Sequence, residues 1–332
     1  MNPLHVREVV VLRLRLSVTD LAGLRFAFSP LWEIVASVRV LGQPAAHTLH
    51  LPWIRSAGAR LKGAGADVSL LRALVPVPTR AIPGFLAPTP LTPLPSLELE
   101  LEALAGTEPE LCRDEVHKVF GVLSGPLAVF DDDPAAGLRA LVGQIRAYHE
   151  VVLEPDWPKI RGLLEGDMMH RGRRLAQGGA ARLFADLDPS IAWQDGTVMI
   201  THSVAGDHDL DERGLVLVPS AFTWPRVFTK VARPWIPVVR YPARGIAGLW
   251  AASQTAPDGL SQVIGRTRAR LLAELDAPAS TTELARRTSL APGGVSAHLT
   301  RLRAAGLVTS HRTGAVVLYA RTSLGDQLLR PR

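Results

Sequence analysis

Apolar residues recur along this chain with two different periods, which predict where helices give way to strands. A helical period runs through residues 97–187, with long amphipathic stretches after Pro134 and Asp156. Shorter runs at 9–18, 191–200, 214–219 and 236–241 have the spacing or apolar density of strands. Asp195-Gly196 interrupts the second of these runs and is a strong signal for a two-residue hairpin turn. This mixture predicts an α+β N-terminal region of helices plus antiparallel strands.

Two further stretches refine the N-terminal region. Ser29-Pro30 predicts a helix start, with Ser29 as the cap and Pro30 at the first helical position, and Gly42 predicts its end. Seven prolines lie between Leu74 and Ser96. Prolines at this density exclude a helix and disfavour central strands. We therefore expect an extended, partly buried segment there, the alternative being a proline-rich recognition peptide.

The pattern near the C-terminus predicts two short helices separated by a tight break. Ser280, followed by Glu283, is typical of a helix cap. Pro292 suits the first position of the second helix, and Gly306 suits its end. Between them, one buried stripe is predicted for Val295, Leu299 and Leu302. A short helix, a break and a second helix indicate a helix-turn-helix.

The residues around this pair predict a winged helix. Residues 307–312 and 315–321 read as strands joined at Thr313-Gly314, and a helix is expected over 260–276. A linker over 255–259 divides the chain into an N-terminal α+β sensor or dimerisation region, 1–254, and a winged helix-turn-helix domain, 258–332. In such a domain the second helix enters the major groove of double-stranded DNA.

The distribution of charge agrees with this interpretation. Residues 258–332 contain 11 arginines, no lysine and five acidic residues, a net charge of +6. The whole chain has 37 basic and 31 acidic residues, also +6, so the first 257 residues are neutral overall. All the excess positive charge therefore lies in the segment predicted to contact phosphates.

The stretch TTELARRTSLAPGGVSAHLTRLRAAGLVTSHRTGAVVLYART resembles the winged helix of ArsR-type bacterial transcriptional regulators, over about 258–329. FAFSPLWEIVASVRVL, GGAARLFADL, GLVLVPSAFTWPRV and YPARGIAGLW resemble the N-terminal region of a group of actinobacterial ArsR-like regulators of little-known function. The resemblance implies DNA-contacting roles for Ser280, Thr281, Gly293, Gly294, Ser296, Ala297, Thr300, Arg301, His311, Arg312 and Thr313. The first helix, TTELARRT, lacks the cysteine of metal-sensing members, so thiolate metal sensing there is unsupported.

Other classes of function find little support. Cys112 is the single cysteine, and no signal peptide or membrane span is apparent, so a cytoplasmic protein is expected. No catalytic motif emerges, and we expect no enzyme activity, catalytic residue, cofactor or metal. Three groups of residues could in principle bind a metal, but surface, capping or loop roles are favoured for each of them. They are His47 with His50, Asp131 to Asp133, and the cluster of His202, Asp207, His208, Asp209 and Asp211.

The sequence therefore predicts a DNA-binding transcriptional regulator that binds an inverted-repeat operator as a homodimer. Its N-terminal region would sense a small molecule or a partner. The expected effector pocket lies near Trp157, Trp193, Trp224 or Trp235. The alternative is an assembly or architectural regulator, whose N-terminal region only dimerises or binds protein and takes no ligand.

Overall fold

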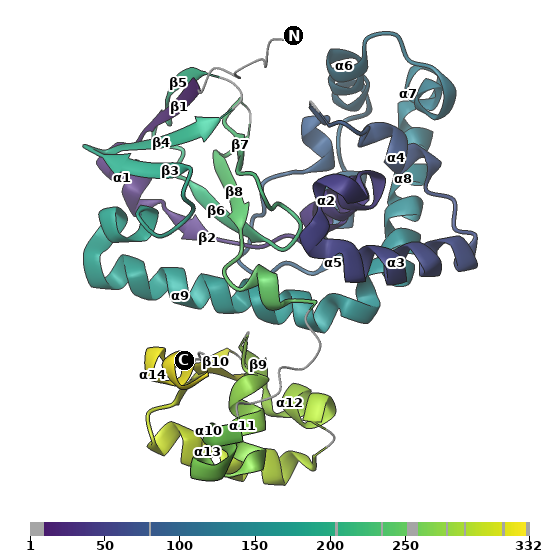
Figure 1. Ribbon diagram of the computed structural model, residues 1–332. Coiled ribbons are helices and arrows are strands. Elements are labelled where there is room, and N and C mark those ends of the chain that lie inside the picture. Colours follow the sequence, from purple (N-terminus) through teal and green to yellow (C-terminus); the bar gives the residue numbers. More distant parts are fainter. Residues whose placement is uncertain are drawn as a thin grey trace, which may run out of the picture. The chain divides into compact units, whose positions relative to one another are not determined.

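The computed structural model describes residues 10–79, 81–202, 205–233, 235–250, 258–276, 278–288, 290–313 and 316–329 of the 332-residue chain. The chain forms two compact units (Figure 1). The N-terminal unit comprises residues 1–156 and 168–243, and the C-terminal unit comprises residues 157–167 and 244–332. The predicted linker at 255–259 lies mostly in residues 251–257, outside the described residues. Within the described residues, no helix is both long and apolar enough to cross a membrane.

The N-terminal unit contains two four-stranded sheets. The first has the order β3-β4-β1-β5, and the second has the order β2-β6-β8-β7. Their strands are β1 (Val10–Arg15), β2 (Arg25–Phe26), β3 (Ile191–Gln194), β4 (Thr197–His202), β5 (Gly206–Asp209), β6 (Val216–Ser220), β7 (Phe228–Lys230) and β8 (Val238–Pro242). The α+β class is confirmed, but both sheets are mixed, because β1–β5, β2–β6 and β6–β8 pair in parallel. Apolar spacing along one strand does not reveal the direction of its neighbour.

The hairpin between β3 and β4 forms as the sequence predicts. Asp195 and Gly196 both have positive φ angles, 47° and 79°. That conformation matches the right-handed twist of the flanking strands, and glycine and aspartate tolerate it. Apolar side chains from both sheets then share one core, which includes Leu14, Val198 and Leu217.

The helix α2 (Pro30–Gly42) begins as predicted, since the Ser29 hydroxyl accepts a hydrogen bond of 2.9 Å from the Trp32 amide. It differs from an ordinary amphipathic helix because every residue from Pro30 to Val40 is buried, including Glu33 and Arg39. Trp32 packs in a cluster with Val216, Val218 and Val238 of β6 and β8, and Figure 1 shows α2 beside these strands. These strands are thus covered on both faces, which explains their nearly continuous apolar sequence.

The remaining helices of this part of the chain are α1 (Val18–Ala22), α3 (Leu51–Ala64), α4 (Ser69–Leu74), α5 (Leu97–Ala105), α6 (Pro109–Phe120), α7 (Val129–Asp132), α8 (Pro134–Tyr148) and α9 (Trp157–Phe184). Single turns lie at Pro44–Ala46, Thr48–His50, Gly84–Leu86, Gly125–Ala128, His149–Leu153, Glu154–Asp156 and Ile246–Gly248. The proline-rich segment has no strand among its described residues, as expected. Helix α9 loses helical geometry at Gly178 and Gly179.

The C-terminal unit contains α10 (Asp258–Ile264), α11 (Arg266–Ala273), β9 (Ala279–Ser280), α12 (Thr281–Thr288), α13 (Pro292–Ala304), β10 (Val308–Thr313), β11 (Val316–Arg321) and α14 (Ser323–Leu328). Its sheet has the order β10-β11-β9. The single helix expected over 260–276 is two helices, because Gly265 has a φ of 87° that interrupts the helix. The predicted hairpin forms, but its tip, Gly314-Ala315, lies outside the described residues.

Candidate nucleic-acid interface

The first helix of the pair, α12, begins at the residue predicted to cap it. The Ser280 hydroxyl accepts a hydrogen bond of 3.1 Å from the Glu283 amide. The Glu283 carboxylate binds Arg286 and Arg287, each at 2.8 Å. Ser280 also belongs to β9, opposite Leu318 of β11, so the cap ties the helix start to the sheet.

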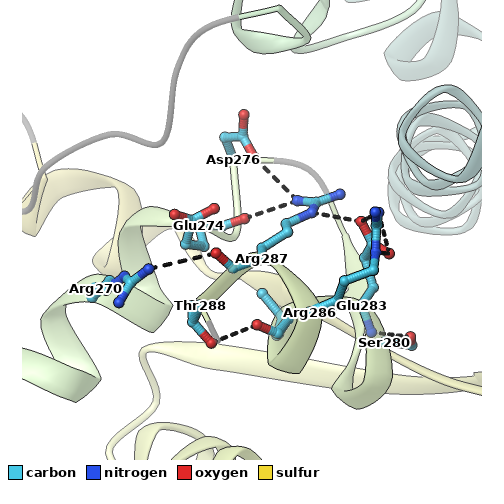
Figure 2. Close-up of polar contacts among 9 residues, drawn as sticks. Arg270, Glu274, Asp276, Ser280, Glu283, Arg286, Arg287 and Thr288 are labelled. Carbon is cyan, nitrogen blue, oxygen red and sulfur yellow. Dashed lines mark hydrogen bonds and ion pairs between the residues drawn. The ribbon is translucent and has the colours of Figure 1, made fainter. Parts of the chain in front are cut away.

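Arg287 connects α12 to the end of α11 (Figure 2). Its Nη1 donates to the Glu274 carbonyl oxygen at 3.3 Å and lies 3.9 Å from the Asp276 carboxylate. Its Nε donates to Glu283 at 2.8 Å. The Arg287 side chain is largely buried, at 13% exposure, so these bonds act within the fold. We infer that Arg287 positions α12 and contributes little free charge for a phosphate.

The second helix, α13, has the two faces that the sequence predicts. Val295, Leu299 and Leu302 are buried, at 0%, 0% and 2% exposure, and pack in the core of the C-terminal unit. The side of α13 that carries most of the residues expected to contact DNA is exposed, namely Gly293, Gly294, Ser296, Ala297, Thr300 and Arg301. Burying one stripe therefore places these six residues together on one accessible surface, which we call the α13 surface.

The α13 surface offers few side-chain groups for reading bases. Gly293 and Gly294 are open, since an added Cβ would meet no atom within 4 Å. The Thr300 hydroxyl donates to the Ser296 carbonyl oxygen at 3.0 Å, so its proton is used within the helix. Arg301 has no polar partner within the described residues and is free to reach an external anion.

The β10–β11 hairpin carries the remaining predicted contacts. Arg312 is exposed on β10, and the backbones of His311 and Thr313 pair with those of Leu318 and Val316. Arg303, whose role is not evident from its position in the sequence, donates from Nη1 to the Ser310 hydroxyl at 3.1 Å and so links α13 to β10. Thr281, also predicted to contact DNA, is half-buried at the first position of α12.

The four tryptophans expected near an effector pocket are all half-buried. Trp157 begins α9, and Trp193 on β3 stacks on Phe184 with ring centroids 5.2 Å apart. Trp224 lies in the loop between β6 and β7. Trp235 lies under the Lys230 ammonium, 3.6 Å from the ring centroid. None of the four lines the cavity of about 320 Å³ in the N-terminal unit, which Trp32 does line.

The three places weighed for metal binding have other contacts. Among the described residues, no group of three or more histidine, cysteine or acidic side chains could hold a metal ion. Asp207 and Asp209 form ion pairs with Arg15, and Asp133 caps α8 by accepting from the Ala136 amide at 2.9 Å. His47 and His50 are buried at 4% and 0% exposure, so they are not surface histidines. Each does occupy the position before a helix, His47 before Thr48–His50 and His50 before α3, but neither side chain makes a capping hydrogen bond. Burial lowers the pKa of His50 to about 4.

Two parts of the chain match known families. Residues 266–311, from α11 into β10, match the helix-turn-helix domain. Residues 129–247 match a family of unknown function (DUF5937). No curated protein and no solved structure matches the chain. The first match points to a transcription regulator rather than to an enzyme. The chain therefore joins a region that matches a helix-turn-helix domain, of the kind found in DNA-binding transcription regulators, to a region that matches a family of unknown function.

Proposed function

We propose that this protein is a transcriptional regulator of the ArsR-like winged-helix type that binds an inverted-repeat operator as a homodimer. The observation that carries this proposal is the α13 surface, an exposed and largely uncharged helix face bounded by Arg301. Small residues there allow the backbone to come close to DNA, and an arginine at the edge suits a phosphate. The hairpin beside it supplies a second cationic position, Arg312.

Base reading by this surface is sparse. Ser296 can bond to several bases and Ala297 can contact a thymine methyl group, but neither forms a bidentate pair with one base. Specificity should therefore depend on DNA shape and on the distance between the two half-sites of a dimer. Half-site centres one helical turn apart, about 10 base pairs or a multiple of that, are expected.

Within this proposal the N-terminal unit senses a small molecule. The cavity in that unit supports a sensor over a module that only dimerises or binds protein, because a small-molecule sensor needs a concave site and an assembly module needs only an apolar interface.

Selection of duplexes from a random pool by the full-length protein tests the DNA-binding proposal. Enriched sites should contain inverted repeats, and the complex should have the mass of two chains on one duplex. Arg301→Ala should weaken binding to selected and random duplexes alike. Arg139→Ala is the matched control, since it removes one exposed arginine from α8 in the other unit. A pool that shows no enrichment, with equal affinity for all duplexes, would contradict sequence-specific regulation.

A further inference from the structure

A cavity of about 320 Å³ lies in the N-terminal unit between α2, the proline-rich segment and the strands β7 and β8. Most of its wall is apolar and includes Val35, Ala36, Val75, Ile82 and Ala87. This volume suits a small organic molecule, since ligand cavities begin at roughly 300 Å³. The size and the apolar wall alone would fit many ligands, so the polar groups of the wall decide which kind is favoured.

Two arginines supply those polar groups. Arg39 of α2 and Arg240 of β8 line the cavity and are 8% and 6% exposed. Arg39 uses only its Nη2, which donates to the Phe222 carbonyl oxygen at 3.0 Å and lies 3.5 Å from that of Thr223. Arg240 uses only its Nη1, which donates to the Trp32 carbonyl oxygen at 3.3 Å. The buried Nε of each has no hydrogen-bond partner.

Buried cationic donors without a protein acceptor are unfavourable, because burial removes them from bulk solvent. No ion pair joins Arg39, Arg240 or the nearby Lys230 to a carboxylate within the described residues. Glu33 interacts electrostatically with Arg240, and Glu115 with Lys230, but neither acid lines the cavity. Both accept hydrogen bonds from backbone amides, Glu33 from that of Ala221 at 2.8 Å and Glu115 from that of Phe85 at 2.6 Å. The cavity wall is therefore short of negative charge.

The electrostatics agree with the geometry. Burial, followed by the positive charges of Arg240 and Arg226, lowers the pKa of Arg39 to about 9. Burial lowers the pKa of Lys230 to about 7, although Glu115 opposes the shift. Burial also lowers the pKa of Arg240 to about 10, although Glu33 opposes the shift. An anion in the cavity would stabilise the charged forms of these three side chains.

Aromatic rings complete the wall. The Arg240 guanidinium lies 5.2 Å from the ring centroid of Trp32 and 5.1 Å from that of Phe228, and the Arg39 guanidinium lies 4.7 Å from the Phe228 centroid. Stacking on rings orients a guanidinium while its edge keeps donors for a planar acceptor. A carboxylate is such an acceptor, and it commonly binds arginine through two parallel hydrogen bonds.

We propose that this cavity binds a small organic carboxylate with an apolar body, held through Arg39 and Arg240. Its role as an effector rests on the proposed function, but its binding does not. The carboxylate compensates the two guanidinium groups, and the apolar body replaces water along the aliphatic and aromatic wall. The side chains that supply this chemistry come from α2, β7 and β8, so the ligand contacts both this helix and this sheet.

Calorimetric titration of the full-length protein with 2-naphthoate, and with its neutral isostere 2-naphthamide, tests the charge requirement without any mutation. Naphthoate should bind saturably and at least tenfold more tightly than naphthamide, where tenfold corresponds to about 1.4 kcal/mol. Equal affinity for the two probes would show an apolar cavity with no anion preference and would overturn the proposal. Absence of saturable naphthoate binding up to about 5 mM would overturn it as well.

Arg39→Met and Arg240→Met test the two residues individually. Each should weaken naphthoate binding at least tenfold and leave naphthamide binding unchanged, because the apolar wall remains. Replacing a buried, unpaired cation by an apolar side chain is often tolerated by the fold. Arg226→Met is the matched control, since Arg226 is exposed but close enough to influence the pKa of Arg39. An equal loss in this control would show that net charge alone explains binding. Arg39→Lys, which keeps the charge, should bind better than Arg39→Met.

A parallel DNA titration separates this proposal from the proposed function. Saturating naphthoate should change the affinity for a selected duplex by fivefold or more, because coupling between two sites is reciprocal and typically of this size. Naphthoate binding by a protein that binds no DNA would sink the proposed function and leave the anion site standing. DNA binding by a protein that does not bind naphthoate would rule out the anion site and leave the proposed function standing.

Discussion

Gly294→Ala changes one methyl group on the α13 surface and should move stability and DNA binding in opposite directions. Gly294 lies in the first turn of α13, with helical backbone angles and no atom within 4 Å of an added Cβ. Alanine therefore fits the folded protein without a clash. It also lowers the conformational entropy of the unfolded chain, so the substitution should stabilise the C-terminal unit.

The size of the gain follows from helix propensity. Alanine is favoured over glycine by about 1 kcal/mol in a helix, and by somewhat less near its end. At Gly306, only twelve positions later, the same substitution should lower stability instead of raising it. Its φ is 69°, where a Cβ is strained, although nothing lies within 4 Å of it. Gly306→Ala should therefore cost about 1 kcal/mol.

Amide hydrogen exchange of α13 in the full-length protein measures both effects, because protected amides report the free energy of opening. Gly294→Ala should slow exchange about fivefold and Gly306→Ala should accelerate it about fivefold, as expected for 1 kcal/mol in each direction. In DNA titrations, Gly294→Ala should weaken binding to a selected duplex about tenfold. Gly306→Ala should bind that duplex with the wild-type affinity wherever it remains folded.

Close approach of the backbone to DNA is the proposed reason for a glycine at position 294. A Gly294→Ala protein that is more stable and binds DNA as tightly as wild type, or more tightly, would refute it. An unchanged exchange rate would instead show that the first turn of α13 is already frayed in the native state.

Four further outcomes are expected. Arg301→Ala and Arg312→Ala should each lower the slope of log affinity against log salt by about 1, measured with selected and random duplexes. Stoichiometric Zn(II), Cd(II) or As(III) should leave the protein bound to DNA, because Cys112 is fully buried, and burial together with Glu115 raises the pKa of its thiol to about 12. Metal-induced release of DNA that is abolished by Cys112→Ser would contradict this expectation. Leu299→Ala should destabilise the C-terminal unit by about 2–5 kcal/mol, seen as faster exchange in α13. Burial raises the pKa of Glu100 from 4.5 to about 7. Its contribution to the free energy of unfolding is therefore full below pH 4.5 and is lost as the pH rises through 7. In urea unfolding, the free energy of unfolding of Glu100→Gln should depend less on pH over this range.

The C-terminal unit was largely predictable because its determinants are local. The Ser280 cap, Pro292 at the first position of α13, and the left-handed Gly306 lie within a few residues of the helix ends that they define. The stripe of Val295, Leu299 and Leu302 depends only on helical spacing. For the same reason the Asp195-Gly196 hairpin was identified correctly. Gly265 is the local exception, since a single glycine within an apolar pattern does not reveal whether its φ is positive.

The sequence by itself thus determined the helix-turn-helix, the hairpins and the concentration of positive charge, all of which follow from neighbouring residues. Only the tertiary structure decided the parallel pairing of β6 with β8, the burial of His47 and His50, and the cavity. Arg39 and Arg240 are separated by two hundred residues, and each interrupts an apolar run without indicating a partner. They line one cavity because α2 packs on the sheet formed by β6 and β8, an arrangement fixed by the whole core and not by any one segment.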